Sequence, residues 1–207
     1  MFMAEKTGTT TIGLVYKDGV VLAADRRVSL DHIVAHPNGQ KIFPVTKNIG
    51  ITTAGLVSDL QVLVKLIQAE TRLFTIRSGS EMTTEAVVGL LSSMLYEKRL
   101  SLNILYAELI VGGYDTKPRL FVIDEVGSYT EDKYAFTGSG GVFALGVLQA
   151  DYKDNMSEEE AIRLAHKAVS SSLQRDVYTG NGIDIVVINK KGYNKLTDEE
   201  INKIISK

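Results

Sequence analysis

The feature that most constrains the fold lies near the N-terminus, where two β-prone apolar runs flank Asp18-Gly19. The first run begins at Thr9, and the second ends at Asp25. An Asp-Gly pair between such runs predicts a tight hairpin, because both residue types tolerate the positive φ of the turn. We therefore expect Thr9 to begin a strand, and we expect Asp25, at the end of the paired strand, to lie directly beside it.

Thr9 suggests a specific chemistry. A threonine hydroxyl is a weak nucleophile unless a base lies next to it, and a free α-amine on the same residue is one such base. Cleavage after Gly8 would create this amine, whose ordinary pKa is about 7.7–8.0. Gly8 has no side chain to obstruct attack by the Thr9 hydroxyl on its carbonyl, so the chain could release its own leader. The alternative is that residues 9–11 are only a β-prone strand start.

Six short motifs resemble, in the same order, those of the β-type subunit of the 20S proteasome in its archaeal form. They are Gly8-Thr9-Thr10-Thr11, Ala24-Asp25-Arg26-Arg27, Asn38-Gly39-Gln40-Lys41, Thr53-Ala54-Gly55-Leu56, Thr137-Gly138-Ser139-Gly140 and Gln174-Arg175-Asp176. The likeness extends from Gly8 to about Ile188. It implies the four-layer αββα sandwich of N-terminal nucleophile hydrolases, and the activity of a threonine endopeptidase that degrades unfolded proteins to short peptides. Residues 1–8 are then a propeptide removed by autocatalytic cleavage, and residues 9–207 form the hydrolase domain.

The order of the predicted elements agrees with this fold. Strand-like runs cover residues 49–54, 107–113, 120–124 and 183–189. Helical periodicity or capping patterns begin at residues 58, 84, 143, 157 and 197. Separate blocks of strands and helices predict two packed sheets covered on their outer faces, which is an α+β arrangement. No linker divides the 207 residues, so one domain is expected.

Hydrolysis by an N-terminal threonine near neutral pH needs a positive charge that eases deprotonation and a carboxylate that holds this charge in place. The resemblance assigns these roles to Lys41 and Asp25. It assigns the backbone N–H of Gly55 to the oxyanion of the tetrahedral intermediate. It also implies that a group of polar side chains binds the terminal amine, namely Ser139, Asp176 and Thr179, the last of which stands where the family usually has serine.

Substrate recognition in this family is extended, since the peptide adds as a strand between two loops. The resemblance places this backbone pairing at Ser29 and Val57. The pocket for the side chain before the cut bond would be lined by Val28, Phe43, Thr53 and Val57. Family members often carry a larger apolar residue where Thr53 stands, so this pocket is expected to be wider or more polar than usual.

Composition excludes several other functions. The net charge is −2 and the basic residues are scattered, so neither nucleic acid nor an anionic membrane is expected as a partner. The absence of cysteine excludes disulfides and thiol catalysis. No apolar run approaches the roughly twenty residues of a membrane span, and a cytoplasmic protein is expected. His32 and His36 lack a third ligand, so no metal or other cofactor is expected.

The resemblance also implies partners. It predicts assembly into seven-membered rings, with four stacked rings and 28 subunits that include α-type subunits, and a regulatory ATPase that delivers unfolded polypeptides. Two alternatives remain open from the sequence. One is a structural β-type ring subunit that keeps its leader and does not cut, and the other is a different N-terminal nucleophile enzyme, such as an amidase.

Overall fold

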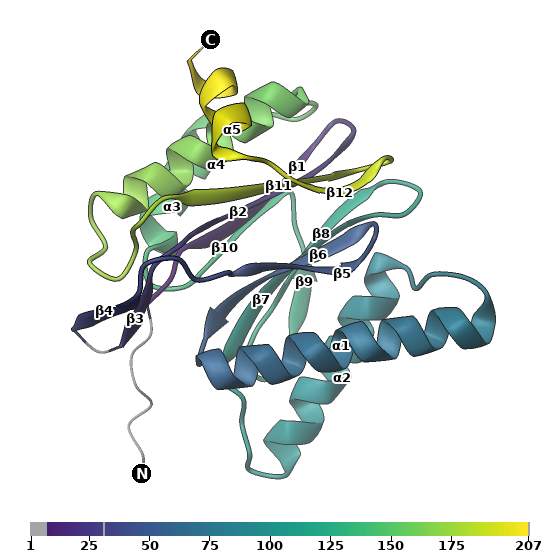
Figure 1. Cartoon of the computed structure of the whole chain (residues 1–207). Helices are drawn as coiled ribbons and strands as arrows, with labels where there is room; N and C mark the ends of the chain where they lie inside the picture. The colour runs from purple at the N-terminus through teal and green to yellow at the C-terminus, as the bar shows by residue number, and fades with distance from the viewer. Residues whose placement is uncertain (1–7, 31, 207) are drawn as a thin grey trace.

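The computed structural model describes residues 8–30 and 32–206, so residues 1–7 of the predicted propeptide lie outside the described part. Two five-stranded antiparallel sheets dominate the fold (Figure 1). The first sheet has the order β10-β1-β2-β11-β12 and consists of β10 (Tyr134–Thr137), β1 (Thr11–Tyr16), β2 (Gly19–Asp25), β11 (Ile183–Asn189) and β12 (Gly192–Lys195). The second has the order β5-β6-β7-β8-β9 and consists of β5 (Ile42–Thr46), β6 (Ile49–Gly55), β7 (Ala107–Tyr114), β8 (Pro118–Ile123) and β9 (Tyr129–Glu131).

Helices cover the outer face of each sheet, which gives four layers (Figure 1). On the first sheet lie α3 (Gly141–Asp151), α4 (Glu158–Leu173) and α5 (Asp198–Ile205), and on the second lie α1 (Val57–Ser78) and α2 (Thr84–Leu100). Three apolar clusters fill the spaces between successive layers. The predicted αββα sandwich of the α+β class is therefore confirmed. Among the described residues, no helix combines the length and apolarity that crossing a bilayer requires.

The opening hairpin forms, but β1 begins at Thr11, two residues after the predicted Thr9. The turn residues are Lys17 and Asp18, because Gly19 already pairs with Tyr16 in β2, and neither Asp18 nor Gly19 has the positive φ that was expected. β1 and β2 pair antiparallel with Thr11 opposite Ala24, and the backbone N–H of Asp25 donates to the carbonyl of Thr10 at 3.2 Å. β2 is buried along its whole length because it lies in the middle of the first sheet and is covered on both faces. This register brings the carboxylate of Asp25 beside the start of β1.

Helix termini agree closely with the capping signals. Ser157 and Glu160 form a capping box at the start of α4, and Thr197 and Glu200 form another at α5. The helix expected from Phe143 begins two residues earlier, at Gly141, because the Gly138–Gly141 turn continues directly into α3. A short hairpin of β3 (Val28–Leu30) and β4 (Ile33–His36) projects beside the start of β1 (Figure 1).

Candidate active site

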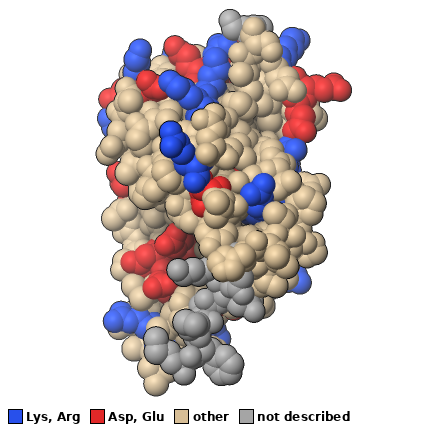
Figure 2. Space-filling view, turned by 90° about the vertical axis from the view of Figure 1, so that its left-hand side faces the viewer, with Lys and Arg blue, Asp and Glu red and all other residues tan. Residues whose placement is uncertain are grey.

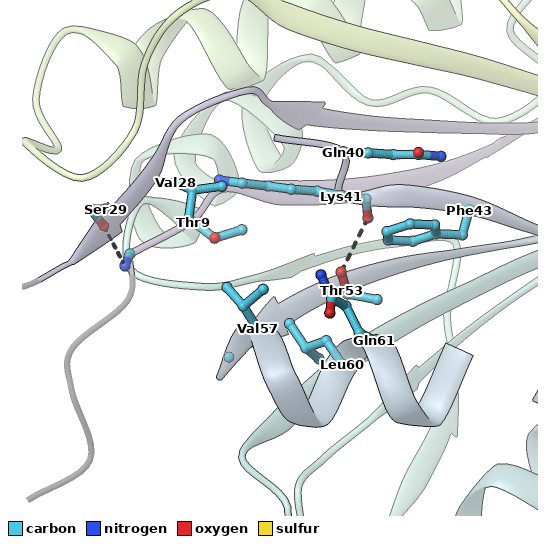
Figure 3. Close-up of a pocket in the computed structure, with 12 residues that line it drawn as sticks. Thr9, Val28, Ser29, Gln40, Lys41, Phe43, Thr53, Val57, Leu60 and Gln61 are labelled. Atoms are coloured by element: carbon cyan, nitrogen blue, oxygen red, sulfur yellow. Dashed lines mark hydrogen bonds between the residues drawn. The ribbon is translucent and has the colours of Figure 1, made fainter. Parts of the chain in front are cut away.

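A pocket opens at the end of the sandwich where β1 begins (Figure 3). The predicted residues Gly8, Thr9, Lys41 and Gly55 line it. All five residues predicted to contact substrate line it as well, namely Val28, Ser29, Phe43, Thr53 and Val57. Sequence reasoning did not single out the remaining lining residues Gln40, Leu60 and Gln61. Residues 57, 60 and 61 share one face of the first turns of α1, as i, i+3 and i+4 spacing requires.

Asp25 and Lys41 form a buried ion pair at the back of this pocket. The Lys41 Nζ donates to Asp25 Oδ1 at 2.7 Å, and the two side chains are 6% and 0% exposed. Three backbone N–H groups also donate to the Asp25 carboxylate, those of Thr10, Arg27 and Gly180, each at 3.0 Å. Because both oxygens of Asp25 are held in this way, the carboxylate fixes the position of the ammonium group.

The protonation of Lys41 reflects this burial. Burial lowers the pKa of Lys41 below its ordinary value, and the carboxylate of Asp25 opposes that shift. The ion pair with Asp25 thus places a positive charge in the pocket that Thr9 lines.

A second network surrounds the backbone nitrogen of Thr9. In the uncut chain this N–H donates to Ser139 Oγ at 3.3 Å, and the Ser139 hydroxyl donates to Asp176 Oδ2 at 2.7 Å. The Thr179 hydroxyl donates to the same carboxylate oxygen at 2.6 Å. The three residues that were predicted to act on the terminal amine therefore lie in one hydrogen-bonded group, and Ser139 is the member that contacts the Thr9 nitrogen.

Thr10 connects the two networks, and sequence reasoning did not identify it. Its hydroxyl lies 2.8 Å from the Thr179 hydroxyl, whose proton already goes to Asp176, so Thr10 is the donor of this pair. Its backbone N–H donates to Asp25. A Cβ on Gly140 would lie 2.0 Å from the Thr10 hydroxyl oxygen, so the glycine at this position leaves room for the contact. In the sequence, the only signal for Thr10 was its place in the middle of three consecutive threonines.

The backbone at Gly8 is held against the same pocket. Its N–H donates to Ser29 Oγ at 3.0 Å (Figure 3). A Cβ on Gly8 would lie 1.9 Å from the Cβ of Tyr178, so any larger residue would displace the chain. Glycine is therefore required by local space as well as by access to its carbonyl. Ser29 was predicted to pair with substrate backbone, and here its side chain binds the segment that precedes Thr9.

Gly55 adopts a conformation that other residues rarely take. Its φ is +134°, and a Cβ would lie 2.0 Å from the carbonyl oxygen of Tyr106. We expect Gly55→Ala to lower the free energy of unfolding by about 1–3 kcal/mol, because the residue would be strained and would displace Tyr106, which directly precedes β7. Thermal unfolding of the purified chain measures this effect. Gly146→Ala is the control, since its added Cβ would meet nothing within 4 Å and its midpoint should not fall.

No group of three or more histidine, aspartate or glutamate side chains is placed to hold a metal ion within residues 8–30 and 32–206. On the face turned toward the viewer in Figure 2, described charged side chains of both signs are interspersed among neutral ones. The groups that characterise the pocket are therefore the buried Lys41–Asp25 ion pair and the network of hydroxyl groups around Asp176.

Comparison with known proteins identifies the family. The family model of proteasome subunits matches residues 5–188. Proteasome subunit beta 2 of Hyperthermus butylicus is 45% identical over 192 residues, which cover 93% of this chain and 90% of that protein. Proteasome subunit beta of Thermoplasma acidophilum is 42% identical over 203 residues, which cover 98% of this chain and 95% of that protein. The chain therefore belongs to the proteasome subunit family, as a subunit of the β type.

Proposed function

We propose that this β subunit is a threonine endopeptidase of the 20S proteasome core, with Thr9 as its nucleophile. A proteasome peptidase role follows from the family, and the assignment of Thr9 goes beyond it. One observation supports that assignment. Thr9, two residues before β1, lines the same pocket as Lys41 of the buried Lys41–Asp25 pair, and its nitrogen contacts Ser139 of the Ser139–Asp176 pair.

Leader removal would be the first reaction of the new chain. The Thr9 hydroxyl attacks the Gly8 carbonyl and loses its proton to a neighbouring base, and the peptide bond to the Thr9 nitrogen breaks. The nitrogen takes up a proton and becomes a free amine, while residues 1–8 remain as an ester on the Thr9 oxygen. Water then hydrolyses this ester. The close packing of Gly8 beside Ser29 and Tyr178 supports this step, because it restricts the position of the attacked carbonyl.

Peptide hydrolysis would repeat the same chemistry on a substrate. The free Thr9 amine takes the hydroxyl proton, the oxygen attacks the substrate carbonyl, and the Gly55 N–H stabilises the oxyanion. The amine then delivers the proton to the leaving nitrogen, and water hydrolyses the acyl ester. Lys41 favours the deprotonated hydroxyl by its charge, and Asp25 holds Lys41. Ser139, Asp176 and Thr179 orient the amine.

The pocket beside Thr9 would receive the side chain that precedes the cut bond. Thr53 lines this pocket and its hydroxyl donates to the Lys41 carbonyl at 3.4 Å (Figure 3). We expect Thr53→Leu to lower kcat/KM for bulky apolar residues relative to alanine about tenfold, because the added carbons occupy the pocket. Paired fluorogenic peptides that differ only at this residue measure the ratio. Thr53→Ser keeps the hydroxyl and should leave the preference for bulky residues unreduced.

The assembly proposed is four stacked seven-membered rings with α-type subunits, supplied with unfolded polypeptides by a regulatory ATPase in the cytoplasm. The names of the relatives support a place in a proteasome, and the ring numbers and the ATPase are part of the proposal. Native mass spectrometry of the chain expressed with its α-type partner gives the stoichiometry.

The experiment that tests the proposed function treats active particles with an electrophile that reacts with N-terminal threonine. Intact mass and peptide mapping should show a mature chain that begins at Thr9 and carries the adduct on that residue, with peptidase activity lost in proportion. Active particles whose chains all keep residues 1–8 would contradict the mechanism. Inactive particles with the leader retained would favour the structural-subunit alternative, and an active monomer would favour an amidase.

A further inference from the structure

Glu108 breaks the pattern of the strand on which it lies. In β7, residues 107, 109 and 111 face the helices α1 and α2, while Ile110 faces the first sheet. Glu108 lies on the same side of β7 as Ile110 by strand alternation, but it is the second residue of the strand and its side chain is exposed there. An exposed acid at this position has no packing role, so any effect of Glu108 must come from the contact that its carboxylate makes.

The carboxylate of Glu108 crosses from the second sheet to the first. Its Oε2 accepts a hydrogen bond from the backbone N–H of Gly138 at 3.0 Å. Gly138 directly follows β10 and has a φ of +82°. Glu108 therefore anchors the start of the turn that connects β10 to α3.

This turn is the one that carries Ser139 to Thr9. A Cβ on Gly138 would lie 2.2 Å from the Thr9 carbonyl oxygen, so the two backbones are in close contact. On the other side of Ser139, the Gly140 N–H donates to the same carbonyl oxygen at 3.3 Å. The turn is thus fixed to Thr9 through Gly140 and to β7 through Gly138, with the Ser139 hydroxyl between these two attachments.

We propose that Glu108 is a positioning residue, which holds the Gly138 N–H and so keeps the Ser139 hydroxyl within reach of the Thr9 nitrogen. This inference rests on the proposed function, in which that nitrogen becomes the general base. Its physical reason is that strand pairing with β1 holds the chain as far as Thr137, and the bond to Glu108 adds a restraint on Gly138 itself, which has no side chain. Glu108 itself does not contact the substrate in this proposal.

Three substitutions separate the reach of the side chain from its charge. Glu108→Gln keeps an oxygen acceptor at the same distance without charge, Glu108→Asp keeps the charge on a shorter side chain, and Glu108→Ala removes both. Assembled particles of each variant are assayed for kcat and KM with one fluorogenic peptide, and for the rate of leader removal. Glu125→Ala is the control, because Glu125 is an exposed acid in the turn between β8 and β9, at the same end of the sheet.

We expect kcat to fall about tenfold in Glu108→Ala and Glu108→Asp, which corresponds to the loss of one hydrogen bond. KM should stay unchanged, leader removal should slow to a similar degree, and Glu108→Gln and Glu125→Ala should match the wild type. Thermal unfolding of the particles should not distinguish the variants, because Glu108 is exposed in the chain. The kcat loss with recovery by glutamine is a result that a general loss of stability would not give.

Two outcomes would overturn the inference. A wild-type kcat in both Glu108→Ala and Glu108→Asp would show that the contact has no effect on the reaction. Full activity in Glu108→Asp together with loss in Glu108→Gln would show that the charge matters and the reach does not. Neither outcome affects the assignment of Thr9, which is tested separately by the N-terminal adduct and by Thr9→Ala particles.

Discussion

Thr9→Ala is expected to abolish peptide cleavage and removal of residues 1–8 in the same chain while leaving the four layers intact. The substitution removes the only hydroxyl of the residue proposed to attack both carbonyls. Hydrolases of another class that lose their nucleophile lose roughly six orders of magnitude in kcat, and a similar loss is expected here. The measurements are turnover of a fluorogenic peptide by assembled particles and the intact mass of the chain.

The fold should survive because the Thr9 side chain is not needed for the contacts around it. The contacts that hold this segment use its backbone, namely the N–H to Ser139 and the carbonyl to Gly140. The unfolding midpoint of Thr9→Ala should therefore stay close to that of the wild type. Thr9→Ser is the matched control, since it keeps the hydroxyl and should keep measurable activity.

A second form of the same variant separates the nucleophile from the blocked amine. A Thr9→Ala chain produced without residues 1–8 would have a free amine and an open pocket, but no hydroxyl. It is expected to be as inactive as the variant that keeps its leader. Fluorogenic peptide hydrolysis by that mature Thr9→Ala particle would show that another residue is the nucleophile, and the proposed mechanism would be wrong.

Much of the fold could be predicted from the sequence because its long elements carry strong local signals. The capping boxes at Ser157 and Thr197 mark the starts of α4 and α5, and the periodicity after residue 57 marks α1. The short strands β3, β4, β5, β9, β10 and β12 were not predicted. They have three to five residues each, which is too short for an alternating pattern to distinguish a strand from a loop.

The candidate site, too, could be predicted only in part from the sequence. The proximity of Asp25 to the start of β1 follows from the hairpin register and needed no comparison. Lys41, Ser139 and Asp176 lie on other segments, so only the resemblance to a family could bring them to Thr9. Glu108 was missed because nothing in the sequence distinguishes an exposed acid that makes a specific contact from one that does not. Its partner Gly138 belongs to the other sheet, and that pairing depends on how the sheets pack.

Loss of the Lys41 charge is expected to have the second large effect on activity, and Lys41→Met is the variant that tests it. Methionine fills most of the same volume without the charge, so the pocket keeps its lining while the proposed electrostatic support for Thr9 is lost. We expect kcat to fall by at least about a thousandfold, at the upper part of the range for groups that assist proton transfer. The chain should also retain residues 1–8, because leader removal would use the same hydroxyl.

The effect of Lys41→Met on stability must be measured separately from its effect on catalysis, because removing one partner of a buried ion pair leaves the charge of the other uncompensated. Such a change costs about 3–5 kcal/mol where the remaining ion has no other support. Asp25 would still accept three backbone N–H groups, so the loss of stability should lie below that range. Thermal unfolding and native mass spectrometry of Lys41→Met particles measure stability and assembly independently of activity.

Lys195→Met is the matched control for this prediction. Lys195 donates to Asp184 at 2.8 Å, a distance close to that of the Lys41–Asp25 contact, but its side chain is 46% exposed. Asp184 also keeps Arg26 as a partner when Lys195 is removed. Lys195→Met should therefore cleave peptides at the wild-type rate. If Lys41→Met particles assembled, removed their leader and kept the wild-type kcat, the threonine would not depend on the buried ammonium group. The activation of Thr9 would then have to come from its amine and the Ser139 network alone.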